Sequence, residues 1–338
     1  MKLTNKWLIN FVLISSLFVS VNGFAAVDYP ESPGIEDTAI YLSNSGISRI
    51  NIETLEIKWS VLTRKQTSEP VVTGRHVVVG SNTGMYVLDK LSSSKIWSIQ
   101  TKHTLFSPLV GNNAAFVGRK TSLFQAIDIQ NTQTGQVLWS MKFEGWVYPP
   151  ALAGEILVIG GNRLYITAVD KTTGNTLWEK RISQELVYRP VNIDRNRIVI
   201  STFGNETQLI NSKSRYVIWT FRSKVPNFSP VLMKNEIVFG TLDGRLQSVN
   251  IGNGKLLWEH KIGGHLSIQT YPELGTVMIS NNQGKIVKID ANDGLIKWRK
   301  QVSSKMVGAP LLLKEDVIVF HSKRFNTSSS VEVFDTSQ

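Results

Sequence analysis

The chain has 338 residues, no cysteine and a formal net charge of +11 at pH 7. Without cysteine it has no disulfide, no thiolate metal ligand, no cysteine nucleophile and no site for lipid attachment at an N-terminal cysteine. The basic residues are spread along the chain and form no long run, which favours a basic, solvated surface. An anionic partner, such as an envelope membrane surface or an acidic protein, is the alternative interpretation of the charge.

The N-terminal segment predicts a secretory signal peptide. Lys2 and Lys6 precede an apolar stretch over residues 7–21, and small residues follow it. A basic start, an apolar core of about fifteen residues and a small-residue exit are typical of an export signal. The core is shorter than the roughly 20 apolar residues of a membrane-spanning helix. We expect cleavage after Ala25, or alternatively after Ala26, and a periplasmic product without an integral span. A retained N-terminal anchor is the competing interpretation.

Seven tryptophans recur along the rest of the chain at intervals of 38 to 42 residues. They are Trp59, Trp97, Trp139, Trp178, Trp219, Trp258 and Trp298. No single helix or strand has a period near forty, so the interval is the length of one supersecondary unit. The chain is therefore predicted to be an array of such units.

Residues 150–182 show the pattern of one unit. Two short apolar runs flank a Gly154-Glu155 turn, a third run covers residues 163–170, and a fourth covers residues 175–182. Short runs rich in β-branched and aromatic residues, separated by Gly, Asn and Asp, are typical of strands. Four antiparallel strands in about forty residues make one blade of a β-propeller. The predicted fold class is therefore all-β.

Each unit carries the same residues at its boundaries. A proline opens the first strand at Pro70, Pro108, Pro150, Pro190, Pro230, Pro272 and Pro310. An Asp or Asn stands eight residues before the tryptophan at Asn51, Asp89, Asp170, Asn211, Asn250 and Asp290, and a Gly stands four residues before it at Gly135, Gly174, Gly254 and Gly294. The Asp or Asn can accept backbone N–H groups across a turn in which Gly takes the position with positive φ. Asp128 lies eleven residues before Trp139, which predicts a three-residue insertion. Each tryptophan is expected to stack on the neighbouring blade and to be structural.

The repeats predict a single, monomeric propeller of eight four-stranded blades, with seven as the alternative. Six complete units run from Pro70 to Trp298, and an incomplete unit lies on either side of them. Closing the ring would leave no sheet edge exposed, and the residues before position 38 offer a strand for this purpose. The predicted boundaries are a signal peptide at 1–25, a lead-in able to supply the ring-closing strand at 26–37, and the propeller at 38–338.

The tryptophan-docking motif on an exported eight-bladed chain resembles the pyrroloquinoline-quinone-type β-propeller superfamily and, within it, the non-catalytic BamB-like branch. The resemblance covers residues 38–338, with motif positions in most units. It implies a non-enzymatic periplasmic scaffold without a cofactor, which binds envelope proteins during assembly of a cell-envelope or outer-membrane complex. The sequence departs from that branch in lacking a lipid-bearing cysteine, so membrane attachment would come through a partner. Export argues against a nucleic-acid partner.

Two other functions are kept as alternatives: a quinone-dependent oxidoreductase or small-ligand-binding propeller, and a propeller that binds envelope polysaccharide. The dehydrogenases of the superfamily use a calcium or lanthanide ion, and a hard cation needs about six converging oxygens. No segment of the sequence delivers such a cluster, and the five histidines show no metal-ligand spacing. The prediction is therefore no catalytic, cofactor-binding or metal-binding residue.

A candidate interaction surface is predicted where the repeat is interrupted. Four consecutive units carry an aromatic residue two positions before the opening proline: Phe106, Tyr148, Tyr188 and Phe228. These rings form either a binding lip or inter-blade packing. Irregular and inter-blade loops add Arg119, Lys120, Trp146, Arg189, His265, Lys323 and Arg324. Loops that vary on a fixed scaffold often carry function, and solvated connections are the alternative.

Overall fold

The structure is a computed structural model and is nearly all-β. It describes residues 9–12, 34–36, 39–43, 46–51, 54, 56–62, 67–68, 70–100, 106–111, 113–129, 135–186, 188–228, 230–302, 310–313, 316–322 and 328–335. These residues form eight four-stranded antiparallel sheets, in agreement with the eight blades predicted. The chain divides into two compact units: Pro33–Ser229, called the first unit below, and Met1–Ser32 with Pro230–Gln338, called the second unit.

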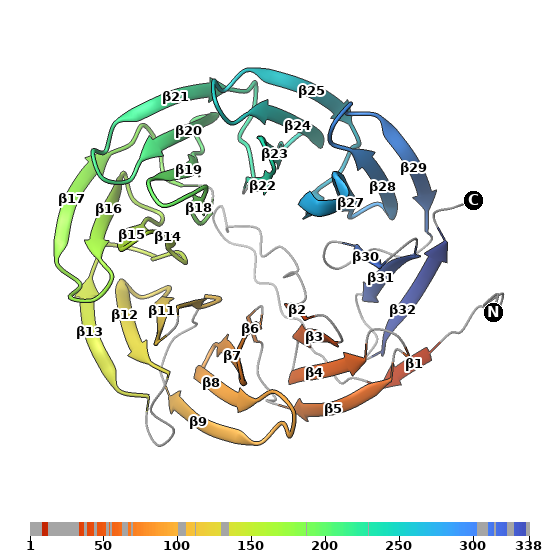
Figure 1. Cartoon of the computed structure of the whole chain (residues 1–338), viewed down its shortest axis with the longest axis horizontal. Coiled ribbons are helices and arrows are strands. Elements are labelled where there is room, and N and C mark those ends of the chain that lie inside the picture. The colour runs from red at the N-terminus through yellow and green to blue at the C-terminus, as the bar shows by residue number, and fades with distance from the viewer. Residues whose placement is uncertain are drawn as a thin grey trace. The chain divides into compact units, whose positions relative to one another are not determined.

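The first unit contains five sheets, each built from four strands that are consecutive in the chain (Figure 1). The first two are β2 (Gly34–Glu36), β3 (Ala39–Ser43), β4 (Gly46–Asn51) and β5 (Ile57–Leu62), then β6 (Val71–Thr73), β7 (His76–Ser81), β8 (Gly84–Asp89) and β9 (Lys95–Gln100). The third is β10 (Leu109–Val110), β11 (Ala114–Gly118), β12 (Leu123–Asp128) and β13 (Val137–Lys142). The last two are β14 (Ala151–Ala153), β15 (Ile156–Ile159), β16 (Tyr165–Asp170) and β17 (Thr176–Arg181), then β18 (Val191–Asn192), β19 (Arg197–Ser201), β20 (Glu206–Asn211) and β21 (Val217–Arg222). Strand β2 lies in the predicted lead-in.

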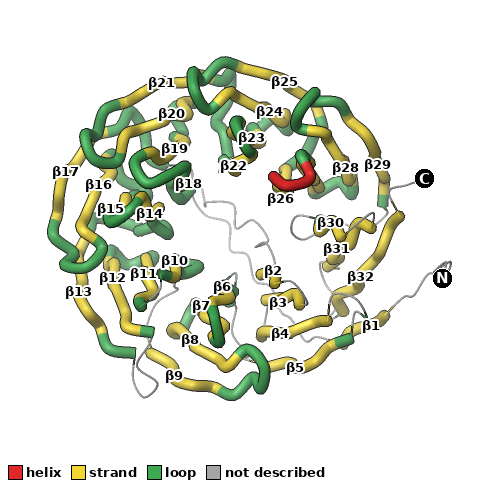
Figure 2. The backbone as a smooth tube through the Cα atoms, viewed as in Figure 1, coloured by secondary structure: helices red, strands yellow, loops and turns green. Residues whose placement is uncertain are grey.

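The second unit contains three sheets and one turn of 3-10 helix, η1 (Pro272–Leu274), drawn in red in Figure 2. Two sheets follow chain order: β22 (Val231–Met233), β23 (Glu236–Gly240), β24 (Arg245–Asn250) and β25 (Leu256–Lys261), then β26 (Leu266–Tyr271), β27 (Thr276–Asn281), β28 (Lys285–Asp290) and β29 (Ile296–Gln301). The third pairs β30 (Leu311–Leu313), β31 (Asp316–Ser322) and β32 (Ser328–Asp335) with β1 (Ile9–Val12). Strand β1 therefore comes from the segment predicted to be the signal peptide.

The core lies within and between neighbouring sheets. The second strand of a sheet is covered on both faces, so Val77, Val78 and Val79 in β7 are all fully buried. This explains why these strands appear in the sequence as unbroken apolar runs instead of alternating patterns. In the first unit, one buried cluster joins residues such as Val158 of β15 and Ile200 of β19, and thus two consecutive sheets.

In the first unit, tryptophans of the fourth strands fasten one sheet to the next. The indole Nε1 of Trp59 donates to the carbonyl oxygen of Lys90 at 3.0 Å, and that of Trp139 donates to Lys171 at 3.1 Å. The indole Nε1 of Trp178 donates in the same way to the carbonyl oxygen of Ser212 at 2.7 Å. Each acceptor directly follows the Asp or Asn of the turn motif in the next sheet. These three contacts are consistent with the predicted structural role of the tryptophans.

The turn motif shapes the surface on which the tryptophan rests. The Oδ1 atom of Asp170 accepts hydrogen bonds from the backbone N–H groups of Thr172 and Thr173, at 3.0 and 2.8 Å. Gly174 then has φ +73°, and a Cβ added there would lie 2.6 Å from the ring of Trp139. Glycine is therefore required by the backbone conformation and by the close approach of the indole.

Trp97 is the exception to this pattern. Trp97 is only 4% exposed, yet its Nε1 has no hydrogen-bond partner among the described residues. The next sheet contains the predicted three-residue insertion. Asp128 N–H bonds to the carbonyl oxygen of Gln136, eight residues on, whereas Asp170 N–H bonds to that of Asn175, five residues on. The longer turn does not bring a described carbonyl to the indole of Trp97.

This contrast gives a matched pair of substitutions. Trp178→Phe removes an indole hydrogen bond and leaves the carbonyl of Ser212 unpaired, whereas Trp97→Phe removes an N–H group that lacks a described partner. We expect the free energy of unfolding to fall further for Trp178→Phe, by about 1 kcal/mol, since a hydrogen bond contributes on that order. Urea denaturation of both variants measures the difference. Equal losses would show that the indole hydrogen bond does not fasten the sheets.

The pairing of β1 with β32 makes cleavage of the N-terminal segment a second testable prediction. Ile9 lies opposite Val331 and Val12 opposite Ser328, so removal of residues 1–25 takes away one strand of this sheet. We expect protein recovered from an exporting bacterium to begin at Ala26, as shown by N-terminal sequencing and intact mass. A mass that includes residues 9–12 would contradict the cleavage and support a retained N-terminal strand.

Candidate interaction surface

The residue two positions before the opening proline is placed by the same backbone contact in three sheets. The backbone N–H of Phe106 donates to the carbonyl oxygen of Gly118 at 3.2 Å, and that of Tyr148 donates to Gly160 at 2.9 Å. The acceptor is the glycine near the end of the second strand of the same sheet in each case. This shared contact gives the aromatic side chains equivalent positions in consecutive sheets. A Cβ on Gly118 would lie 2.2 Å from the carbonyl oxygen of Val147, the residue before Tyr148. The segment that enters the next sheet therefore fits against Gly118 only because this residue is glycine.

Three of the four predicted aromatic residues form one continuous contact, called the aromatic row here: Phe106, Tyr148 and Tyr188. The rings of Phe106 and Tyr148 meet edge to face, with centroids 5.5 Å apart and an angle of 82° between their planes. The rings of Tyr148 and Tyr188 have centroids 5.8 Å apart and are tilted by 47°. Both geometries are favourable for aromatic pairs. The row therefore crosses three consecutive sheets of the first unit.

Tyr148 is the buried centre of the row. Only 2% of the residue is exposed, and it belongs to a cluster with Ile166, Leu186 and Ile200. Burial, with the negative charge of Glu185 as the second cause, raises the pKa of the Tyr148 hydroxyl to about 12. For Tyr148 the alternative of inter-blade packing is therefore the correct one, because its ring is covered. Phe106 and Tyr188 are half-buried and complete the row on either side.

Cationic side chains cover the accessible side of the row. The Nζ atom of Lys120 lies 5.8 Å from the ring centroid of Phe106 and 5.0 Å from that of Trp146. The guanidinium carbon of Arg189 lies 6.0 Å from the centroid of Tyr188. A cation this close to an aromatic face is attracted to the negative charge of the ring. These five residues, Phe106, Lys120, Trp146, Tyr188 and Arg189, are called the aromatic–cation surface below.

Arg119, also predicted for this surface, has a different environment. Its guanidinium donates to the side-chain oxygen of Gln125, and burial lowers the pKa of Arg119 below its usual value. Its Nε atom is buried and has no hydrogen-bond partner among the residues that the structure describes. Arg119 therefore bonds to β12 from the connection between β11 and β12, and it is half-buried there.

Four predicted residues remain: Phe228, His265, Lys323 and Arg324. Phe228 is half-buried at the end of the first unit. His265 belongs to the second unit, where its backbone N–H donates to Asn282 Oδ1 at 3.0 Å. Lys323 and Arg324 lie outside the described residues.

Sequence reasoning missed two charged residues in the neighbourhood of the row. Glu185 acts electrostatically on Tyr148, and it lies three residues before Tyr188 in the same inter-blade connection. Arg163 places its guanidinium carbon 4.3 Å from the ring centroid of Phe143, and burial lowers its pKa. Arg163 lies in the bend before β16, and no feature of the sequence singled it out.

No group of three or more His, Cys, Asp or Glu side chains within the described part of the chain could hold a metal ion. Nor does any helix in the described ranges have the length and apolar character needed to cross a membrane.

Four-stranded antiparallel sheets fastened by tryptophans define a β-propeller, and comparison with solved structures shows the same fold. The crystal structure of BamB from Moraxella catarrhalis matches with a TM-score of 0.70 and 13% identity, over 96% of this chain and 100% of that chain. The computationally designed protein Ika8 matches with a TM-score of 0.76 and 14% identity, over 90% and 95% of the two chains.

The family follows from the sequence. A family model described as outer membrane protein assembly factor BamB matches residues 119–270 and 263–337, more than half of the chain. The chain therefore belongs to the BamB family, as the tryptophan-docking motif predicted.

Individual relatives are distant from this chain. BamB of Moranella endobia is 19% identical over 255 residues, which are 73% of this chain and 57% of the relative. BamB of Yersinia pestis is 20% identical over 64% of this chain and 63% of its own length. BamB of Escherichia coli is 23% identical over 77% and 68%. The chain thus spans less than two thirds of the length of the first two of these relatives.

The raised pKa of Tyr148 predicts a loss of stability at high pH. An unfolded chain releases a tyrosine proton near pH 10, whereas folded Tyr148 holds its proton until about pH 12. Because the folded pKa is the higher one, the contribution to stability is complete below pH 10 and is lost as the pH rises toward 12. Tyr148→Phe removes this proton, so its stability should fall less steeply over the same range.

Urea midpoints at several pH values between 9 and 12, for the natural chain and for Tyr148→Phe, measure the two slopes. Tyr271 has a pKa also raised to about 12 by burial and is present in both proteins, so it cancels in the comparison. Parallel slopes would show that the hydroxyl of Tyr148 is not buried.

Proposed function

We propose that this chain is a non-enzymatic, periplasmic scaffold in the assembly of outer-membrane proteins, and that it acts by binding envelope protein partners. Membership of the BamB family supports the process, since the relatives are named as outer membrane protein assembly factors. The chain has no cysteine to carry a lipid, so it would not be held at the outer membrane by a lipid on an N-terminal cysteine, and a partner could supply that attachment.

The aromatic–cation surface is the observation that carries the proposal. Half-buried aromatic faces and an adjacent lysine and arginine are the residue types that dominate binding energy at protein interfaces. Trp146 and Lys120 are 5.0 Å apart from ring centroid to Nζ, and neither serves the tryptophan-docking contact. Such a surface suits a partner segment that carries apolar and acidic side chains, the acids pairing with Lys120 and Arg189.

The surface also rests on a rigid support. Tyr148 and its cluster are buried beneath it, and the entry segments are fixed by backbone hydrogen bonds to Gly118 and Gly160. A partner would therefore meet preformed positions and would not have to order the loops on binding. This is the property expected of a scaffold.

Partner capture tests this function. We expect the full chain, tagged at its C-terminus and recovered from a crosslinked bacterial envelope, to carry outer-membrane assembly proteins identified by mass spectrometry. Trp146→Ala should lower their recovery about tenfold or more, as removal of an aromatic hot spot does. Lys120→Ser and Arg189→Ser should lower it less, and most clearly at low salt.

Arg75→Ser is the matched control, because this arginine is 82% exposed in the same unit and distant in sequence from the surface. Its recovery of partners should equal that of the natural chain. Melting temperatures distinguish lost binding from lost folding, and Lys120→Ser, which alters no buried residue, covers the case in which Trp146→Ala unfolds. Undiminished recovery in all three variants, or no assembly protein with the natural chain, would overturn the proposal.

A further inference from the structure

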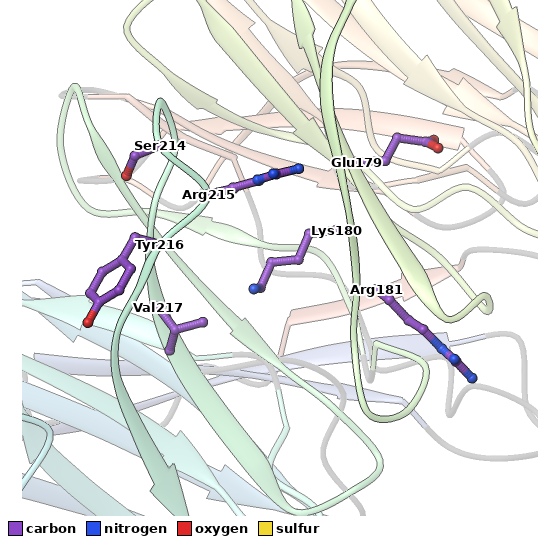
Figure 3. Close-up of a pocket in the computed structure, with 7 residues that line it drawn as sticks. All are labelled: Glu179, Lys180, Arg181, Ser214, Arg215, Tyr216 and Val217. Carbon is purple, nitrogen blue, oxygen red and sulfur yellow. The ribbon is translucent and has the colours of Figure 1, made fainter.

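A shallow groove lies between two neighbouring fourth strands of the first unit. Residues 179–181 of β17 line one side, and residues 214–217, from the β20–β21 turn and the start of β21, line the other. The cavity volume is about 610 Å³. Figure 3 shows the side chains of Lys180 and Arg215 in the space between the two strands, and Tyr216 directed away from β17. The groove is separate from the residues of the aromatic–cation surface.

The turn at this groove departs from the repeat. Arg215 stands four residues before Trp219, at the position that Gly174, Gly254 and Gly294 occupy in other units with φ between +69° and +73°. Arg215 takes the same left-handed conformation, with φ +59°. A residue with a Cβ is strained there, whereas glycine is not. Ser93 has a similar φ of +63° at the equivalent position before Trp97, so the strain alone assigns no role, and what distinguishes Arg215 is the charge of its guanidinium.

Lys180 lies opposite this turn for reasons that the repeat makes clear. It stands two residues after Trp178, as His260 stands two residues after Trp258. His260 reaches across to the carbonyl oxygen of Gly294, the turn glycine of the next sheet, at 2.5 Å. By the same register Lys180 faces the turn residue Arg215. The cations Lys180 and Arg215 therefore occupy the two positions that His260 and Gly294 occupy in another pair of sheets.

No acid neutralises these cations. Among the described residues, Lys180, Arg181 and Arg215 form no ion pair, whereas nearby Arg222 pairs with Glu206 at 2.8 Å. Glu179 is the carboxylate that lines the groove, and it accepts a hydrogen bond from Thr167 Oγ1 at 2.8 Å. Three positive charges against one negative charge leave a net positive groove. Like charges held together in this way favour the binding of an anion.

Exposed apolar side chains flank the groove on the same strands. Tyr216 is 71% exposed, Leu177 in β17 is 50% exposed, and Ile218 in β21 is 40% exposed. A surface that alternates cations with exposed tyrosine and aliphatic side chains suits the boundary between phosphate headgroups and acyl chains. An acidic protein segment would use the cations but has less need of the aliphatic residues.

We propose that this groove binds the phosphate of an anionic lipid headgroup and so brings the outer edge of the first unit to a membrane surface. Lys180 and Arg215 hold the phosphate, Arg181 adds charge, and Tyr216 and Leu177 contact the lipid beneath the headgroup. The surface does not depend on the aromatic–cation surface, so its failure would leave the proposed scaffold function in place.

Vesicle sedimentation of the purified full chain tests the site. We expect binding to vesicles of phosphatidylcholine with phosphatidylglycerol, little binding to phosphatidylcholine alone, and release by salt. Arg215→Gly should weaken binding about fivefold, the usual effect of one basic residue near an anionic membrane. The same variant should melt at an equal or higher temperature, because glycine relieves the strained turn. Lys180→Gln should weaken binding to a similar degree.

Lys234→Gly is the matched control, since Lys234 is an exposed cation with positive φ (+31°) in the second unit. It removes one charge and one strained residue that do not line the groove, and we expect its vesicle binding to be unchanged. Equal losses in Arg215→Gly and Lys234→Gly would show attraction by net charge only and would overturn the site. Binding to poly-glutamate without binding to vesicles would overturn the lipid assignment in favour of an acidic protein.

Discussion

The hydrogen bond from a tryptophan indole to a backbone carbonyl of the next sheet is the interaction on which the first unit depends. It is made three times in the first unit, from Trp59, Trp139 and Trp178, and each acceptor follows the Asp or Asn of the turn motif. The carboxylate or amide fixes the turn, the turn presents the carbonyl, and glycine lets the indole approach. Because three residues from two sheets must meet, these repeat positions are committed to holding the sheets together.

Positions that the docking contact leaves open are where the molecule differs from one sheet to the next. The entry segment before the first strand is fixed by a backbone hydrogen bond at Ser68, Phe106 and Tyr148, so its side chain can vary, and in four consecutive units it is aromatic. The turn residue four positions before the tryptophan is glycine in several sheets but arginine at Arg215. The two candidate binding surfaces therefore arise from one plan, in which a fixed backbone carries different side chains at equivalent positions.

Much of this arrangement can be predicted from the sequence, since the spacing of Trp, Asp or Asn, and Gly determines register. The all-β fold, the eight sheets, the insertion after Asp128 and the proximity of Phe106, Tyr148 and Tyr188 all follow from register. The burial of a side chain does not follow from register. Tyr148 was therefore grouped with accessible residues although it is 2% exposed. The environment of Arg119 could not be predicted for the same reason, because a basic residue in a loop gives no sign that its guanidinium bonds to Gln125. The pairing of Ile9–Val12 with β32 escapes prediction because an export signal and a short strand share one apolar composition.

The central claim is that partners bind where the repeat is interrupted and not at its regular turns. A photoreactive amino acid placed at position 146 or 189 of the full chain, and in separate proteins at the regular turn positions 172 and 253, tests it most directly. After irradiation of living cells, the account predicts crosslinks to outer-membrane assembly proteins from positions 146 and 189, and none from 172 or 253. Crosslinks of equal yield from all four positions, or from the regular turns alone, would contradict it.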